Sequence, residues 1–303
     1  MPPRPVIGRG VLYTWPHTLR HICVLLDEVA YMGIVIAISG GVLQAIGALI
    51  ALQERDVTPK LLIARGGSAL AAGMSACGWR ADELARLART LEHNRLALLA
   101  QLLPALNDPA TELSPRELAL LALGERLGEA LGRELPPVPA ASDDPLEALL
   151  WELTRGVELR DVRMPLAMPV RAYKRVAEQY KPEPEPRLLT SGNDARYAVT
   201  LATALRCAAF TPELAGAPTV GGALLTAWPD ARGEMAAWRR FGGDAPLISI
   251  GPTDGLGYCQ VGPNANGFAI SIPRPGRRDK LRERMDAGYN AVRKHIGEVL
   301  SFC

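Results

Sequence analysis

The sequence predicts an α/β fold of three layers, with a mainly parallel sheet that carries helices on both faces. Two strand-turn-helix units follow one another near the start of the chain. In the first, the apolar residues 32–38 precede a glycine turn and a helical pattern that ends near Leu52. In the second, the apolar run 61–64 breaks at Gly66-Gly67 and passes into an alanine-rich helical stretch up to Cys77. Such alternation builds parallel sheets, because each helix returns the chain to the start of the next strand.

The first of these units has an alternative interpretation as a membrane span. Residues 32–52 carry no charge and are about long enough to cross a bilayer. Gly33, Gly40, Gly41 and Gly47 interrupt the segment, and its two halves differ in character. The first half is β-branched like a buried strand, and the second spaces its apolar residues like a helix. The pattern therefore favours strand, turn and helix.

Composition indicates a protein with a large core and argues against some kinds of partner. A chain of 303 residues, 48% of them hydrophobic, can bury a large core. The net charge of +2 and the 5% aromatic content argue against nucleic acid as a partner. Five scattered cysteines without a Cys-x-x-Cys pair, and a start that does not resemble a signal peptide, indicate a cytoplasmic protein. We expect no metal or cofactor, since His17 and His21 lack a third ligand in view.

The remaining pattern divides the chain into an N-terminal extension, 1–31, and one domain, 32–303, with a helical insertion at about 104–155. A proline-rich run, 181–187, is expected to be a surface loop, because it cannot continue a helix. The other expected elements are helices at 81–103, 114–131, 145–154, 196–209 and 278–300 and a short strand at 246–250.

Ser68 is the leading candidate for a catalytic side chain. It follows Gly66-Gly67 where the second apolar strand turns into a helix. A serine on such a turn projects its hydroxyl, and the helix dipole favours negative charge beside it. This position therefore suits the nucleophile of acyl transfer.

The order of these segments resembles the patatin-like phospholipase family. The resemblance rests on Gly47–Glu54, Gly67-Ser68-Ala69, Ala204–Pro212 and Ala287–Ala291. It implies a serine-aspartate dyad, in which Ser68 is the nucleophile and an Asp takes its proton. It also implies a glycine loop, here Gly40-Gly41, whose N–H groups hold the oxyanion.

Three positions depart from the family pattern. Leu70 stands where the second glycine of the nucleophile motif is expected. Val220 replaces the dyad Asp in front of Gly221-Gly222, and valine cannot accept a proton. The oxyanion loop lacks its third glycine, because Val42 follows Gly41. Together, these changes predict a site with impaired or lost catalysis.

Two functional hypotheses follow from the resemblance. In the first, a catalytically silent relative, or pseudoenzyme, binds an acyl lipid or ester, or pairs with an active homologue. In the second, an active serine hydrolase or acyltransferase of lipid metabolism uses a relocated acid such as Asp254, with Asp230 as a weaker candidate. The lipid ligand implies peripheral membrane contact, and pairing implies a homo- or hetero-oligomer.

Overall fold

The computed structural model describes residues 33–86, 147, 150–151, 153–177, 179–192, 198–209, 217–252, 267–273 and 280–303. The N-terminal extension and most of the helical insertion lie outside these ranges, as do helix 114–131 and most of helix 81–103. The domain boundaries therefore remain predictions. The architecture below is that of the unit formed by Gly33–Cys303.

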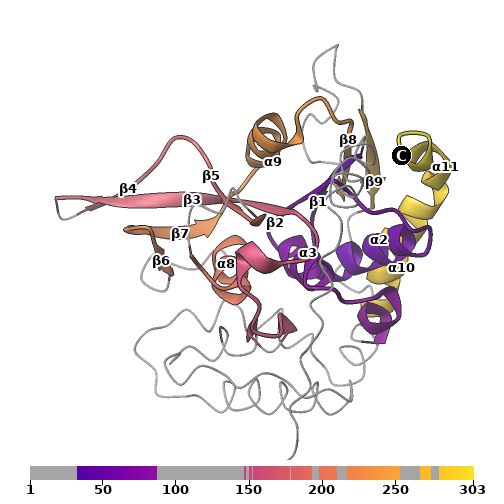
Figure 1. The fold of residues 1–303 in the computed structure, drawn as a ribbon, viewed down its shortest axis with the longest axis horizontal. Coiled ribbons are helices and arrows are strands. Elements are labelled where there is room, and N and C mark those ends of the chain that lie inside the picture. The colour runs from indigo at the N-terminus through magenta and orange to yellow at the C-terminus, as the bar shows by residue number, and fades with distance from the viewer. Residues whose placement is uncertain are drawn as a thin grey trace, which may run out of the picture. The chain divides into compact units, whose positions relative to one another are not determined.

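Five parallel strands form the centre of a sheet (Figure 1). They are β1 (Val35–Ser39), β2 (Leu61–Arg65), β3 (Leu166–Val176), β8 (Leu247–Pro252) and β9 (Gly267–Ile272). Their order across the sheet is β3-β2-β1-β8-β9. Both predicted strand-turn-helix units are present, so the parallel pairing expected from them is confirmed.

Four antiparallel strands extend the sheet on the β3 side. They are β4 (Gln179–Pro182), β5 (Arg187–Thr190), β6 (Thr219–Val220) and β7 (Ala223–Ala227). β4, β5 and β7 all pair with β3, and β6 pairs with β7, which makes nine strands within the described residues. The expected loop 181–187 is wrong at both ends, where Lys181-Pro182 and Arg187 belong to strands. Proline is tolerated in β4 because it lies in a non-hydrogen-bonded pair with Tyr173, and the ladder continues through the Glu183 N–H to the Ala172 carbonyl.

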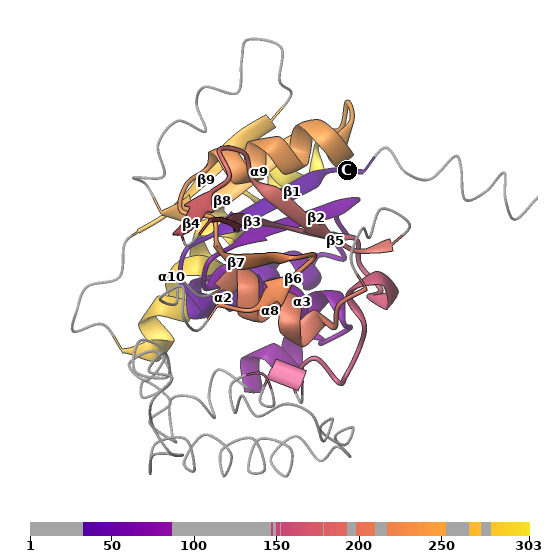
Figure 2. The same cartoon turned by 90° about the vertical axis from the view of Figure 1, so that its left-hand side faces the viewer.

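Helices cover both faces of this sheet, as Figure 2 shows. One face carries α2 (Val42–Gln53), α3 (Ser68–Ala76), α8 (Leu201–Ala209) and α10 (Leu281–Lys294), and α11 (Ile296–Leu300) packs on α10. The other face carries α9 (Arg232–Ala237), which continues as a π-helical segment, Trp238–Gly242. A short 3-10 turn, Leu159–Asp161, precedes β3. The three-layer α/β class predicted from the sequence is confirmed.

Alternation along the central strands separates two apolar cores. Ile36, Ile38 and Leu62 belong to the large core beneath α2, α3, α8 and α10. Val35 and Ile63 belong to the smaller core beneath α9 and the π-helical segment. Because both strand faces are buried, the strands read as continuous apolar runs rather than as alternating ones.

The uncharged segment 32–52 contains β1, a glycine turn and all of α2 except its last residue, Gln53. None of the helices in the described ranges has the length and apolar character needed to cross a bilayer. The expected helix 196–209 is observed as α8, which begins at Leu201, and the expected helices 81–103 and 145–154 are described only in part. The expected helix 278–300 is divided at His295 into α10 and α11.

Candidate functional site

The predicted site residues follow the carboxyl ends of neighbouring parallel strands. β1 leads through Gly40-Gly41 into α2, and β2 leads through Gly66-Gly67 into α3. β8 lies on the other side of β1. Asp254, the proposed relocated base, follows β8 but lies outside the described residues. Ligands of parallel α/β sheets bind at this edge, so the edge remains the candidate site.

The turn between β2 and α3 places its left-handed residue two positions before Ser68. Gly66 has φ +64°, and a Cβ atom added there would meet no atom within 4 Å. Gly67 is the residue before the helix, with φ −54°, and Ser68 is the first residue of α3. In a strand-to-helix turn that presents a nucleophile, the strained residue carries the projecting side chain. That position is held here by a glycine, which has none.

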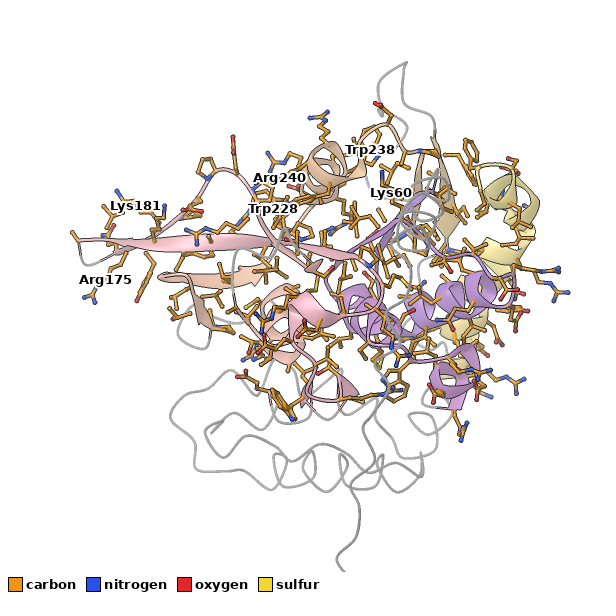
Figure 3. The ribbon with its side chains drawn as sticks, in the orientation of Figure 1. Lys60, Arg175, Lys181, Trp228, Trp238 and Arg240 are labelled. Atoms are coloured by element: carbon orange, nitrogen blue, oxygen red, sulfur yellow. The ribbon has the colours of Figure 1, made fainter. Side chains whose placement is uncertain are left out.

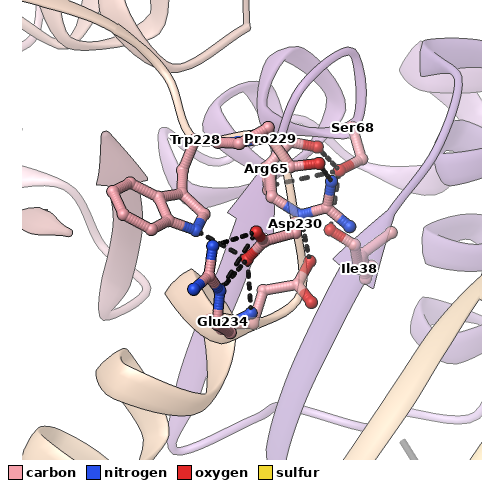
Figure 4. A network of polar contacts seen from close by, with 8 residues as sticks. Ile38, Arg65, Ser68, Trp228, Pro229, Asp230 and Glu234 are labelled. Atoms are coloured by element: carbon pink, nitrogen blue, oxygen red, sulfur yellow. Dashed lines mark hydrogen bonds and ion pairs between the residues drawn. The ribbon is translucent and has the colours of Figure 1, made fainter. Parts of the chain in front are cut away.

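Ser68 itself is buried, and its hydroxyl forms hydrogen bonds with the backbone (Figure 4). Its Oγ lies 2.7 Å from the carbonyl oxygen of Ile38 and 2.8 Å from that of Arg65. The hydroxyl proton is therefore shared between two backbone acceptors at the ends of β1 and β2. A nucleophile needs an exposed hydroxyl next to a base. The Ser68 hydroxyl is buried, and within the described ranges its hydrogen-bond partners are backbone groups of Ile38 and Arg65.

The glycine loop after β1 is short and touches the second turn. Gly40 has φ +109°, and its carbonyl oxygen accepts the Ser68 N–H at 3.0 Å. A Cβ on Gly67 would lie 3.2 Å from both the Gly40 oxygen and the Val42 nitrogen, so only glycine fits there without a shift. Val42 is already the first residue of α2, which is why the loop needs no third glycine. The N-termini of α2 and α3 thus meet at one place.

Val220 belongs to a different feature. Gly221 and Gly222 have φ +57° and +73°, as required for a two-residue turn that joins β6 to β7. Val220 is 5% exposed and packs in the large apolar core. It pairs with Ala223 at the start of β7, whereas the segment after the end of β7 is the part that contacts Arg65.

Val220 and the turn that carries Ser68 lie near opposite ends of β7, which concerns the predicted dyad. The five residues of β7 span about 13 Å, and the described contacts of Ser68 do not include Val220. The glycine pair that resembled the Asp-Gly-Gly element has its own reason in the hairpin turn. The role of Val220 as a degenerate dyad position therefore remains a prediction without a supporting contact.

A buried ion pair beside the turn escaped the sequence analysis. Arg65, the last residue of β2, donates from Nε to Oε1 of Glu234 at 3.1 Å and from a terminal nitrogen to the Pro229 carbonyl at 3.1 Å. The Glu234 side chain is fully buried in α9, and that of Arg65 is 17% exposed. An arginine at the end of the apolar run 61–64 was the available signal. Glu234 had none, because α9 spans only six residues.

Asp230, the weaker candidate base, is engaged by its neighbours. Both of its carboxylate oxygens accept hydrogen bonds from the Arg232 guanidinium, and Oδ1 also accepts from the Trp228 indole at 2.9 Å. The hydrogen bonds from Arg232, the largest influence, lower the pKa of Asp230 from 3.8 to about 2. A carboxylate with so low a pKa is a weak base near neutral pH.

The described ranges contain no metal centre and have a surface pocket away from the glycine turns. There, no three His, Cys, Asp or Glu side chains gather as metal ligands would. A surface pocket of about 350 Å³ lies where α2 ends, lined by Ala51, Glu54, Arg55, Tyr289, Arg293 and Ile296. Because α2 is about 18 Å long, this pocket is remote from the glycine loop at its other end.

Some solved structures are similar to this chain, whereas no family model or curated protein matches its sequence. The solved structure of VipD from Legionella pneumophila is similar at 10% identity and a TM-score of 0.38, over 88% of this chain and 67% of VipD. The type III effector protein ExoU is similar at 13% identity and a TM-score of 0.38, over 88% of this chain and 53% of ExoU. The chain thus spans about half of ExoU, and likeness at this level assigns neither family nor activity.

Proposed function

We propose that this protein is a patatin-like scaffold that binds an acyl lipid at the carboxyl edge of its sheet and does not hydrolyse it. One observation carries the proposal. The residue in the left-handed conformation of the strand-to-helix turn is Gly66, and the nearby Ser68 hydroxyl is buried against two backbone carbonyls. The turn therefore offers the shape of a nucleophile site without the nucleophile.

The two converging helix starts support a binding role for this edge. The first N–H groups of a helix have no acceptor within the helix, and the dipole adds partial positive charge. α2 and α3 begin within contact of each other, at Gly41 and Gly67. A carboxylate or an ester carbonyl is the kind of group that such a place attracts. The first three N–H groups of α3 already donate to the carbonyl oxygens of Gly40, Gly66 and Gly67. The acyl head group is therefore expected at the start of α2, beside Gly41.

Serine-directed labelling tests the absence of catalysis. We expect a fluorophosphonate probe to leave the parent protein unlabelled under conditions in which it labels an active serine hydrolase. Labelling of the parent that Ser68→Ala abolishes would overturn the proposal and restore the hydrolase, with Asp254 as the first base to test.

Binding of cis-parinaric acid, a fluorescent polyene fatty acid, tests the binding role. The fatty acid is kept below the concentration at which it forms micelles. Gly41 is exposed and has φ −76°, so Gly41→Phe adds a bulky side chain at the edge without backbone strain. We expect that variant to weaken binding at least about tenfold, the loss of roughly one good contact. Gly297→Phe, on the open surface of α11, is the matched control and should bind as the parent does. Equal affinity of Gly41→Phe and the parent would refute binding at this edge.

A further inference from the structure

β3 and β4 pair over residues 173–182, the β3–β4 arm. Beyond Tyr173, which also pairs with Leu224 of β7, the arm continues past the rest of the sheet as a two-stranded ribbon. Its register pairs Tyr173 with Pro182, Lys174 with Lys181, Arg175 with Tyr180 and Val176 with Gln179. Figure 1 shows the arm projecting past β7, and Figure 3 places Arg175 and Lys181 near its tip. The arm therefore presents a narrow end rather than a broad face.

The arm is exposed, and its end carries two exposed large apolar side chains. Every residue of β4 is exposed, as are the last three residues of β3. Val176 is 50% exposed and Tyr180 is 44% exposed, and they are two of the three large hydrophobic side chains that are exposed in the described part of the chain. A two-stranded ribbon without a packed face is marginally stable in water. A surface that covers this tip would stabilise it.

Basic side chains surround the same tip on both faces of the ribbon. Directly opposed residues point to the same face, so Lys174, Lys181 and Val176 share one face, whereas Arg175 and Tyr180 share the other. Lys174 also pairs with Glu183 at 2.6 Å, toward the base of the arm. The sequence 174–181 contains three basic residues and one acidic residue, Glu178, so the tip has a net positive charge.

We propose that the β3–β4 arm docks the protein on a membrane that contains anionic phospholipids, with its tip among the head groups. A flat partner on one face of the ribbon would reach either the two lysines or Arg175. A layer of head groups that receives the tip reaches both faces at once. Tyrosine and basic residues are the side chains that favour the interface between lipid and water.

The charge distribution also favours lipid over nucleic acid. A nucleic-acid strand would need cations and stacking aromatics along one continuous face, but here the cations are divided between two faces. The membrane anchor deepens the proposed function, since it rests on acyl lipid as the ligand and adds the surface from which that ligand is taken. With only two apolar side chains at the tip, the contact is weak and reversible.

Vesicle sedimentation with the full chain tests the arm. We expect binding to vesicles of phosphatidylcholine with 30% phosphatidylserine, weaker binding to pure phosphatidylcholine, and release in 0.5 M salt. Arg175→Gln with Lys181→Gln should weaken binding by about 10- to 30-fold, because each cation contributes to attraction by the anionic surface. Val176→Ser with Tyr180→Ser should weaken it without changing the salt dependence.

The matched control removes the same charge elsewhere. Arg282 and Lys294 are exposed on α10, and Arg282→Gln with Lys294→Gln should bind as the parent does. An equal loss in this control, no binding by the parent, or tighter binding to a single-stranded oligonucleotide than to anionic vesicles would each overturn the proposal. All six positions are exposed, so we expect unchanged thermal unfolding in every variant.

The fatty-acid assay separates this proposal from the proposed function. Arm variants that lose vesicle binding but keep cis-parinaric acid binding support the arm as an anchor. A parent protein that binds anionic vesicles but not the fatty acid sinks the proposed function and leaves the anchor standing.

Discussion

Arg65 and Glu234 join the two faces of the site region through one buried ion pair. Arg65 is the last residue of β2, immediately before Gly66, and Glu234 lies in α9 on the opposite side of the sheet from α3. Its Oε1 is 3.1 Å from the Arg65 Nε. Arg65 also accepts the Ser68 hydroxyl on its carbonyl. The conformation of the turn is therefore tied to helices on both faces.

Removing the buried partner of this pair is expected to destabilise the protein strongly. Glu234→Gln should lower the free energy of unfolding by about 2 to 4 kcal/mol, somewhat below the usual cost of breaking a buried pair, because Arg65 is partly exposed. Urea unfolding measures the change. Arg232→Gln is the control, since its pair with Asp230 is exposed and its loss should lower the free energy of unfolding much less. Similar losses in both variants would contradict a special role for the buried pair.

Ser68→Ala is expected to act on stability rather than on activity. The change deletes a buried hydroxyl that bonds to Ile38 and Arg65, so the free energy of unfolding should fall by about 1 to 3 kcal/mol. Ser301→Ala removes an exposed hydroxyl at the end of α11 and should cost under about 0.5 kcal/mol. Chemical unfolding of both variants decides the matter. A Ser68→Ala protein as stable as the parent would speak against the structural role.

Alanine is expected to destabilise the protein at the glycines between α2 and α10 and to stabilise it at Gly297 in α11. A Cβ on Gly288 would overlap the Gln44 carbonyl of α2, so Gly288→Ala should cost about 3 kcal/mol or more. Gly47 faces Met285 in the same way. In α11, a Cβ on Gly297 meets nothing within 4 Å, and Gly297→Ala should stabilise by about 0.5 to 1 kcal/mol. Thermal unfolding measures both changes. A similar shift of the unfolding temperature in Gly288→Ala and Gly297→Ala would contradict the close contact between α2 and α10.

The parallel strands β1, β2 and β8 could be predicted because they are buried on both faces, whereas the parallel strands β3 and β9 were not predicted. Runs such as Val35–Ile38 and 61–64 have no polar residue, and a helical pattern follows each of them. The end of β3 and its partner β4 were missed for the opposite reason. The end of β3 and all of β4 are exposed and charged, and Pro182 hides the strand pattern, so local sequence favours a loop there.

The site was only partly predictable, because sequence locates the turn but not the conformation of its residues. Gly66, Gly67 and Ser68 are adjacent, and any of them could take the left-handed position in a sequence motif. Packing decides: Ser68 fits beneath the end of β1, and Gly67 must lie against Gly40 and Val42. The pairing of Arg65 with Glu234 spans 169 residues, a distance over which no local pattern gives a signal.

Acid should destabilise the protein partly through Glu183. Hydrogen bonds from Arg187 and then Lys174 lower the pKa of Glu183 from 4.5 to about 2. A lowered pKa in the folded state means stability that is present above the unfolded pKa and lost as pH falls from about 4.5 to 2. After allowance for solvent screening of the exposed Lys174, Glu183→Gln should cost about 1 kcal/mol at pH 7.

The difference between Glu183→Gln and the parent should therefore shrink as pH falls and vanish near pH 2. Urea midpoints measured at steps between pH 7 and pH 2 follow this convergence. Glu185→Gln, an exposed carboxylate on the same connection, should run parallel to the parent throughout. A stability gap for Glu183→Gln that stays constant down to pH 2 would show that the carboxylate contributes through packing rather than through its charge.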